Sequence, residues 1–223
     1  MNPADISVVI PTLNEAATIK NAVGSAIDAG AAEIIVCDGG SVDQTIEMAT
    51  DAGASKIIRS VPGRGIQLNA GAVFASREVV LFLHADNRLG PSCLQQICEV
   101  PDVVWGAFMQ RIDHSRFAYR LIEKGNAARV RFRGMAFGDQ AIFVRRDTYK
   151  KVGGFEEIEL MEDVAFSRTM RAIAKPVLLP GPVTISARRW EQRGIVGQTL
   201  QNWNLQCRYR FGASPRQLAK RYR

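Results

Sequence analysis

The chain has 223 residues, of which 47% are hydrophobic and 23% are charged, a composition that excludes a disordered chain and suits one α/β domain with a small appendage. Its net charge of +7 is uneven, because residues 1–110 carry −6 and residues 111–223 carry +13. We expect neither a membrane-spanning helix nor a signal peptide, because no apolar run is long enough to cross a bilayer and the first residues lack a basic stretch.

Residues 1–87 alternate between strand and helix patterns. Continuous apolar runs predict strands at residues 6–10, 33–37, 56–60 and 79–83, and the segments between them predict helices at residues 15–29, 41–52 and 66–75. Ser41 with Gln44 three residues later is typical of a capping box at a helix start. Apolar strands separated by helices predict a parallel, doubly wound sheet with helices on both faces.

The pattern changes after residue 87. We expect short helices and strands that complete the same domain, at residues 91–99, 103–112, 116–131, 140–145, 162–173, 177–179 and 183–185. The last two strands are separated by Pro180-Gly181-Pro182, which predicts a break between them. The order of elements throughout predicts an α/β fold with a mostly parallel sheet.

A basic helical segment follows from Ile195. One apolar stripe along it consists of Val196, Leu200, Trp203, Cys207 and Phe211, while residues 188–223 hold nine Lys or Arg and one Glu. A basic amphipathic helix is typical of a membrane surface, but an apolar stripe more often packs on the core, and we favour core packing.

The four cysteines, Cys37, Cys93, Cys98 and Cys207, form neither a CxxC pair nor a zinc-finger spacing. We therefore expect reduced, structural thiols and a cytoplasmic protein. The basic half could attract phosphates, anionic lipids or nucleic acid, or form a solvated surface. We expect no nucleic acid partner, because no reading motif is present.

Acidic residues follow three of the predicted strands: Glu15, Asp38 and Asp86. The carboxyl ends of parallel strands line the ligand crevice of an open sheet, so these acids should surround one pocket. A fourth acidic position, Glu162-Asp163, begins a later helix. Acids beside such a crevice predict a metal ion and an anionic ligand.

Four motifs in a fixed order carry a resemblance to a known family. They are SVVIPTLNE at residues 7–15, DGGSVDQT at 38–45, GRGIQLNAG at 63–71 and HAD at 84–86. Their order and spacing resemble the family 2 glycosyltransferases over most of residues 6–175. The HAD form and the short length resemble a bacterial subgroup described as radical-SAM/selenodomain-associated transferases. The resemblance implies a GT-A fold, with a Rossmann-like sheet.

The resemblance also implies roles for the donor-side residues. It assigns nucleotide-sugar binding to Pro11, Thr12, Leu13, Glu15, Asp38, Arg64, His84, Ala85 and Asp86. Asp38 would accept a hydrogen bond from uracil, and Arg64 would bind phosphate through its planar guanidinium. Asp86 would bind Mn²⁺ or Mg²⁺ on the diphosphate. His84 stands where the family more often has a carboxylate, and we expect it to contact the ligand or support Asp86 rather than bind the metal.

The remaining roles concern the acceptor. By the same resemblance Asp163 is the catalytic base, and Asp139, Glu162, Arg189 and Trp190 are weaker acceptor-side candidates. Each acid also has a local explanation: Glu15, Glu162 and Asp163 suit helix starts, and Asp38 suits a turn. Asn69 should cap or brace its loop.

These assignments predict a metal-dependent, inverting glycosyltransferase. It would move a sugar from a nucleoside-diphosphate sugar, with UDP favoured, to an unknown acceptor hydroxyl, and the basic C-terminus suggests a lipid-linked acceptor and an anionic membrane surface. Residues 1–190 would form the catalytic domain, with a nucleotide-binding half at 1–87, an acceptor-side half at 88–190 and a basic extension at 191–223. The alternatives are a nucleotidyltransferase and a non-catalytic nucleotide-sugar or membrane-binding module.

Overall fold

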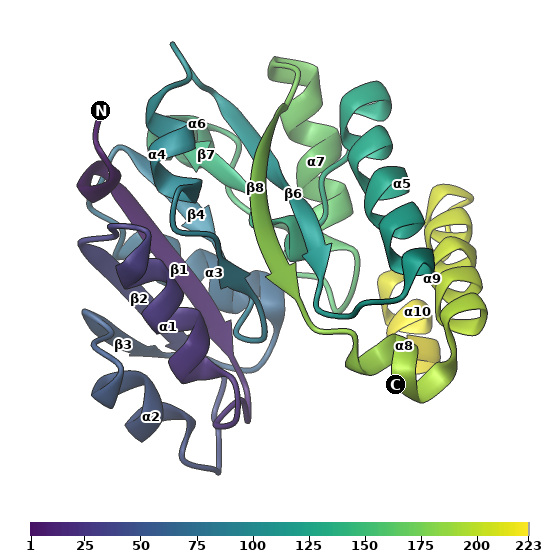
Figure 1. Ribbon diagram of the computed structural model, residues 1–223, viewed down its shortest axis with the longest axis horizontal. Helices are drawn as coiled ribbons and strands as arrows, with labels where there is room; N and C mark the ends of the chain where they lie inside the picture. Colours follow the sequence, from purple (N-terminus) through teal and green to yellow (C-terminus); the bar gives the residue numbers. More distant parts are fainter. Residues whose placement is uncertain (223) are drawn as a thin grey trace.

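A computed structural model of the protein describes residues 1–222, so Arg223, the last residue of the predicted extension, lies outside the described residues. Its centre is an eight-stranded sheet with helices on both faces, in the strand order β3-β2-β1-β4-β7-β6-β8-β5 (Figure 1). The predicted α/β fold with a mostly parallel sheet is confirmed: β1 pairs in parallel with β2 and β4, β2 with β3, and β6 with β8. The strands β7 and β5 run antiparallel to their neighbours.

The first half of the chain follows the predicted alternation. Its elements are η1 (Pro3–Asp5), β1 (Ile6–Thr12), α1 (Ile19–Asp28), β2 (Glu33–Asp38), α2 (Thr45–Asp51), β3 (Lys56–Arg59), α3 (Arg64–Val73) and β4 (Val79–Phe82). The second half contains β5 (Arg88–Leu89), α4 (Cys93–Cys98), β6 (Trp105–Ile112), α5 (Phe117–Arg133), η2 (Gly138–Gln140), β7 (Phe143–Arg145), α6 (Arg146–Lys151), α7 (Glu162–Ile173) and β8 (Val177–Ile185). The chain then forms α8 (Arg188–Arg193), α9 (Ile195–Arg210) and α10 (Pro215–Tyr222).

Two hydrophobic cores lie on the two faces of the sheet. Successive residues of a strand point to opposite faces, so Val8 and Ile10 pack into the core that contains α1, while Val9 packs into the core that contains α3. Gly71 lets α3 approach β1 closely, because a Cβ at this position would lie 2.4 Å from Val9 Cγ1. Close packing on both faces fixes the carboxyl ends of β1 and β4, where the predicted site lies.

Two predicted helix starts were wrong. Helix α1 begins at Ile19 rather than Glu15, and α2 begins at Thr45 without a capping box. The Ser41 hydroxyl donates to Asp38 instead of capping a helix, and Asp38 also accepts from the backbone N–H of Ser41. Turns closed by carboxylates compete with helix here, so both helices start later.

A predicted break between two strands and one predicted strand start were also wrong. Residues 177–185 form the single strand β8, which passes Pro180 and Pro182 with a register shift against β6 between Phe108 and Gln110. A shift of this kind lets a strand continue past residues that cannot join the regular ladder. The strand predicted from Gln140 begins at Phe143 instead, because Gly138–Gln140 form the short helix η2.

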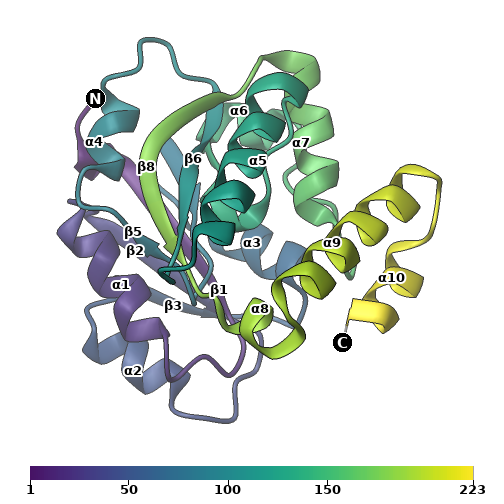
Figure 2. The same cartoon turned by 45° about the vertical axis from the view of Figure 1, so that its right-hand side comes forward.

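The predicted packing of the C-terminal stripe was wrong as well. In α9 the residues Val196, Leu200, Trp203 and Cys207 are exposed or largely exposed, and Phe211 after the helix is exposed too. The buried face of α9 instead contains Gln198 and Leu205. Leu205 and Leu218 of α10 join a third core with Met135, Leu160, Met161 and Val164. This core holds α9 and α10 against the start of α7 and the segment that follows α5 (Figure 2).

Candidate functional site

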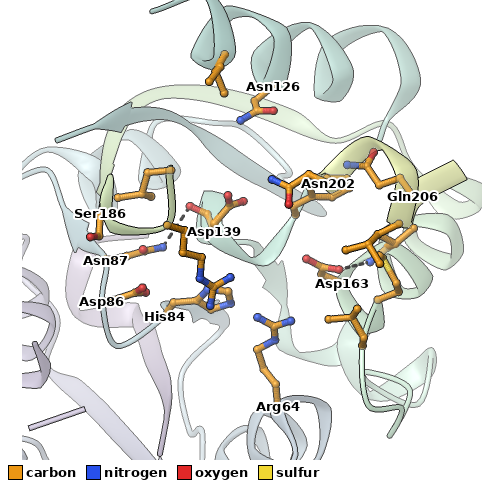
Figure 3. A pocket seen from close by; sticks show the side chains of 18 of the residues that line it. Arg64, His84, Asp86, Asn87, Asn126, Asp139, Asp163, Ser186, Asn202 and Gln206 are labelled. Carbon is orange, nitrogen blue, oxygen red and sulfur yellow. Dashed lines mark hydrogen bonds between the residues drawn. The ribbon is translucent and has the colours of Figure 1, made fainter. Parts of the chain in front are cut away.

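One cavity of about 850 Å³ opens at the carboxyl ends of β1 and β4, a volume that suits a nucleotide-sized ligand. The residues that line it come from these strand ends and from α3, α5, α7, α8 and α9 (Figure 3). The structure brings together most of the predicted site residues in its wall: Pro11, Thr12, Leu13, Glu15, Arg64, His84, Ala85, Asp86, Asp139, Asp163, Arg189 and Trp190. Asp38 and Glu162 are not among the residues that line it.

Asp38 is buried at the end of β2, directly opposite Thr12 in the sheet. Its Oδ2 accepts hydrogen bonds from the backbone N–H groups of Gly40 and Ser41, at 3.0 and 2.9 Å. Its Oδ1 accepts from the Ser41 hydroxyl and, at 3.4 Å, from the Thr12 hydroxyl. These bonds make Asp38 a brace of the turn after β2, and a contact with a base stays a prediction.

Glu15 lies just after β1, half-buried at one edge of the cavity. It accepts a hydrogen bond of 2.9 Å from the Thr18 hydroxyl. Burial, together with the negative charge of Asp86, raises the pKa of Glu15 despite that bond. The opposing positive charges come from Arg188 and Arg189 at the start of α8. The carboxylates of Glu15 and Asp86 therefore face a basic helix end across the same opening.

His84 and Asp163 meet at Gly138, which belongs to η2. The Gly138 N–H donates a 2.8 Å hydrogen bond to Asp163 Oδ2. A Cβ at Gly138 would lie 2.6 Å from His84 Nε2 and 3.6 Å from Asp163 Oδ2, so only glycine fits between them. Burial of the imidazole, with the charges of Arg64 and Arg189 nearby, lowers the pKa of His84 to about 3. His84 is therefore neutral at physiological pH.

Arg64 begins α3 and forms an ion pair with Glu162, the first residue of α7. Burial raises the pKa of Glu162, and the Arg64 guanidinium opposes that rise. Glu162 is almost fully buried, and its Oε2 has no hydrogen-bond partner among the described residues. The pair joins the helix starts of α3 and α7 and points the guanidinium of Arg64 into the cavity (Figure 3).

Asp139 lies deeper in the cavity, beside Arg129 of α5. Burial raises the pKa of Asp139, and the Arg129 charge opposes the rise. Burial also lowers the pKa of Arg129 to about 10, although Asp139 and Asp163 favour its charged form. The Arg129 guanidinium stacks over Phe137 at 3.4 Å and donates to Asn126, Met135 and Gln140. This network fixes the floor of the cavity between β6 and α5.

Helix α8 covers one side of the opening. Its Trp190 packs edge-on against Tyr119 of α5, with ring centroids 6.2 Å apart. This contact positions the preceding residues Arg188 and Arg189 at the cavity wall, opposite Glu15. The predicted Arg189 and Trp190 therefore lie at the site, on the same side as the Asp86 strand end.

The donor atoms fit a hard divalent cation that a phosphate ligand would share. Asp86 offers carboxylate oxygens at the end of β4, but residues 1–222 contain no group of three His, Cys, Asp or Glu side chains arranged to hold a metal. Mg²⁺ and Mn²⁺ accept one carboxylate and take the remaining ligands from phosphate oxygens and water. The site could therefore hold such an ion only together with an anionic ligand.

Sequence comparison decides the family. Residues 7–153, about two thirds of the chain, match the family model for glycosyl transferase family 2. The chain belongs to glycosyl transferase family 2. This confirms the family named by the four motifs and makes the protein a glycosyltransferase, which favours sugar transfer over the predicted nucleotidyltransferase alternative.

Relatives support the same family. The PGL/p-HBAD biosynthesis glycosyltransferase of Mycobacterium bovis is 26% identical over 87% of this chain and 79% of its own length. The glycosyltransferase AglJ of Haloferax volcanii is 43% identical over 28% of this chain. The matched region covers only 21% of the length of that relative.

Solved structures share the fold of this family 2 chain. The structure of TarS residues 1–349 from S. aureus has a TM-score of 0.66 at 16% identity, over 84% of this chain and 61% of that one. Glucosyl-3-phosphoglycerate synthase from Mycobacterium tuberculosis, in complex with Mg²⁺ and UDP, has a TM-score of 0.57 at 19% identity, over 81% of this chain and 69% of that one. These matches confirm the predicted GT-A fold.

Several polar residues of this family 2 site were not predicted. Gln67 is buried and donates to the Thr12 and Cys37 carbonyls, at 2.6 and 3.0 Å, so it ties α3 to the ends of β1 and β2. Asn87 is buried after β4 and donates to the Asp139 carbonyl at 3.2 Å. Gln67 lies within the motif at residues 63–71 and Asn87 directly follows the one at 84–86. This position beside the motifs was the only sequence signal that could have identified them. Asn69 was predicted to brace its own loop, but its side chain instead bonds Phe155 and Tyr149 and so ties α3 to the segment after α6.

Proposed function

We propose that this enzyme transfers a sugar from a UDP-sugar to an acceptor hydroxyl, with a divalent metal and inversion at the anomeric carbon. The supporting observation is that one cavity is lined by Asp86 on the β4 side and by Asp163 on the α7 side, with Arg64 in its wall. A second support is the related fold of glucosyl-3-phosphoglycerate synthase in complex with Mg²⁺ and UDP.

The donor would occupy the side of the cavity formed by the strand ends. Residues 11–13 and Glu15 would hold the nucleoside, while Arg64 and Arg189 would contact the diphosphate. Asp86 would hold Mn²⁺ or Mg²⁺, and the bound ion would offset the negative charge that develops on the leaving diphosphate. The neutral imidazole of His84 would support this wall beside Asp86 rather than add a charge.

The acceptor would approach from the α7 side. Asp163 would remove the proton from the acceptor hydroxyl as its oxygen attacks the anomeric carbon from the face opposite the diphosphate. The bond to the diphosphate oxygen breaks as the new bond forms, so UDP leaves with the bonding electrons and the anomeric configuration inverts. The Gly138 N–H, bonded to Asp163 Oδ2 at 2.8 Å, would hold the carboxylate in place for this step.

The finer predictions from the sequence belong to the same proposal. The HAD form at residues 84–86 supports membership of the radical-SAM/selenodomain-associated subgroup. Residues 1–87 would serve the nucleotide, residues 88–190 the acceptor, and 191–223 would form the basic extension, with the enzyme acting at the cytoplasmic face of an anionic membrane. Among residues 1–222, no helix combines the length and apolarity needed to cross a bilayer.

The donor assignment predicts selective thermal stabilisation. A panel of nucleotide sugars is added to the protein with and without Mn²⁺, and the true donor should raise the melting temperature most in the presence of the metal. Asp86→Asn should remove the Mn²⁺-dependent part of the shift. Asp51→Asn, which changes an exposed carboxylate that pairs with Lys20, is the matched control and should keep it. An undiminished metal-dependent shift in Asp86→Asn would exclude this metal role.

The same preparation tests the base. With the donor found, Asp163→Asn should lower the rate of sugar transfer by about 10²-fold to 10⁴-fold, because the acceptor proton loses its carboxylate. The amide oxygen of asparagine can accept the Gly138 N–H but not also the Val164 N–H that Asp163 Oδ1 accepts, so circular dichroism would verify the fold of this variant. Release of pyrophosphate from a nucleoside triphosphate, or sugar-nucleotide binding with no transfer to any acceptor, would favour the rival functions.

A further inference from the structure

The cavity continues beyond the donor side into a cleft between α5 and α9. Its α5 wall contains Leu121, Gly125, Ala128 and Phe132, which recur every three or four residues and so share one face of the helix. Across from them, α9 presents Thr199, Asn202, Trp203 and Gln206, also on one helical face. Figure 1 shows α9 next to α5, and residues of both helices line the same cavity.

The shape of the α5 wall suits an elongated apolar group. Gly125 and Ala128 are small and lie between the large side chains of Leu121 and Phe132. A Cβ at Gly125 would meet no atom within 4 Å, so the space above this turn of the helix is open. Two large ends and a small middle form a trough along the helix.

The large side chains of this cleft are exposed to solvent. Leu121 is 57% exposed, Phe132 82% and Trp203 65%, although all three line the same cavity. Gathered large apolar side chains of this kind mark a binding surface more often than an ordinary protein surface. The surface belongs to the cavity of the enzyme, so a substrate is the occupant that it fits best.

The inner end of the cleft reaches the proposed base. Leu205 of α9 packs with Met161 and Val164, which flank Glu162 and Asp163 at the start of α7. In Figure 3, Asp163 lies between Arg64 on one side and Asn202 with Gln206 on the other. An acceptor hydroxyl at Asp163 would therefore have the donor on one side and the cleft on the other.

Polar atoms in the same walls can hold a hydroxylated head group. Thr199 Oγ1 and Trp190 Nε1 are buried and have no hydrogen-bond partner among the described residues. Both residues line the cavity. Buried polar atoms of this kind gain free energy when a ligand supplies the missing hydrogen bonds. The cavity thus combines an apolar trough with unpaired polar atoms in its walls.

We infer that the acceptor is an amphiphile whose hydroxylated head lies at Asp163 and whose hydrocarbon part lies in the cleft between α5 and α9. This inference names the acceptor class and rests on the proposed function for its orientation. The hydrocarbon part covers Leu121, Phe132 and Trp203. These side chains are therefore exposed when no acceptor is bound. The polar face of α9 contacts the head.

The test uses 11-(dansylamino)undecanoic acid, whose fluorescence rises in an apolar environment, as a probe of the cleft. It is titrated into the full-length protein below its aggregation concentration, both alone and with saturating UDP and Mn²⁺. The probe should bind in both cases, because UDP occupies the other side of the cavity, and dansylglycine, which lacks the chain, should bind at least about tenfold more weakly.

Two matched pairs of variants locate the probe. The first pair is Leu121→Glu and its control Leu200→Glu on α9. Leu121 lines the cleft and Leu200 does not, and their side chains are 57% and 58% exposed. The second pair is Phe132→Ser and its control Phe211→Ser. Phe132 lines the cleft and Phe211 does not, and their side chains are 82% and 86% exposed. The cleft variants should weaken probe binding about tenfold, and the controls should stay within about twofold. Because all four side chains are exposed, the variants should fold, as circular dichroism would verify.

Three results would overturn the inference. The first is equal loss in cleft and control variants, and the second is competitive displacement of the probe by UDP. The third is a wild-type dimer in light scattering that Leu121→Glu dissociates, which would make the cleft an interface between copies. Failure of UDP to bind with Mn²⁺ contradicts the proposed function instead, and the titration of the probe alone still reports on the cleft.

Discussion

At the scale of single residues, Gly138 lies between His84 on the donor side of the cavity and Asp163, the proposed base. We predict that Gly138→Ala lowers kcat/KM for sugar transfer about a hundredfold, because a Cβ 2.6 Å from His84 Nε2 must displace the imidazole or move the N–H that holds Asp163. Steady-state kinetics with the identified donor would measure the loss. The melting temperature should fall less than it would for a large-to-small substitution in the hydrophobic core.

The matched control for this substitution is Gly24→Ala in α1. A Cβ at Gly24 meets no atom within 4 Å, so alanine should stabilise the helix by up to about 1 kcal/mol and leave transfer unchanged. Wild-type kcat/KM in Gly138→Ala would show that the contact between η2 and His84 is not required for transfer. Loss in both variants would indicate a general effect of alanine on folding.

At the scale of elements, Glu33 joins three strands at the end of the sheet opposite the site. It lies at the start of β2 and accepts hydrogen bonds from Ser7 of β1 and from the hydroxyl and backbone N–H of Ser76, which precedes β4. Burial alone would raise its pKa, but these bonds outweigh burial and hold the pKa of Glu33 below its ordinary value of 4.5. The ionised carboxylate therefore stabilises the folded state.

This linkage predicts a pH-dependent effect of Glu33→Gln. A lowered folded-state pKa contributes stability above pH 4.5, and that stability is lost as pH falls through the folded-state pKa. Glu33→Gln should cost about 2 kcal/mol at pH 7 in urea unfolding, and the difference from wild type should shrink on acidification below pH 4.5. The exposed Glu47→Gln in α2 is the control, at about 0.5 kcal/mol or less. A pH-independent cost would contradict the linkage.

The elements also show which features the sequence could predict. The strands β1, β2 and β4 and the helix α7 follow from local apolar patterns. Of the acids at their ends, Glu15, Asp86 and Asp163 line the cavity as predicted, whereas Asp38 and Glu162 do not. The ion pair of Arg64 with Glu162 joins residues 98 positions apart, so no local pattern could indicate it. Leu205 packs against the start of α7, and this contact determines which face of α9 is buried. That face includes Gln198 and excludes the apolar stripe, so the pattern of α9 alone could not predict it.

At the scale of the whole molecule, the uneven charge and the exposed stripe of α9 predict binding to anionic membranes. Residues 111–223 carry +13, while Val196, Leu200 and Phe211 are exposed on or beside α9. Basic residues near an anionic surface contribute about 1 kcal/mol each, and salt screens this attraction. Flotation with phosphatidylserine-containing vesicles should therefore recover the protein at low salt and lose it at high salt.

Charge substitutions on opposite halves separate this membrane surface from general electrostatics. Arg210→Gln with Lys220→Gln should weaken flotation about tenfold or more, because both residues belong to the basic C-terminal helices. Lys20→Gln with Arg59→Gln removes the same charge from the acidic half and should have little effect. Truncation before α9 is a poorer test, because Leu205 and Leu218 belong to the third core. Equal loss in both double variants would assign the binding to net charge alone and contradict an oriented membrane surface.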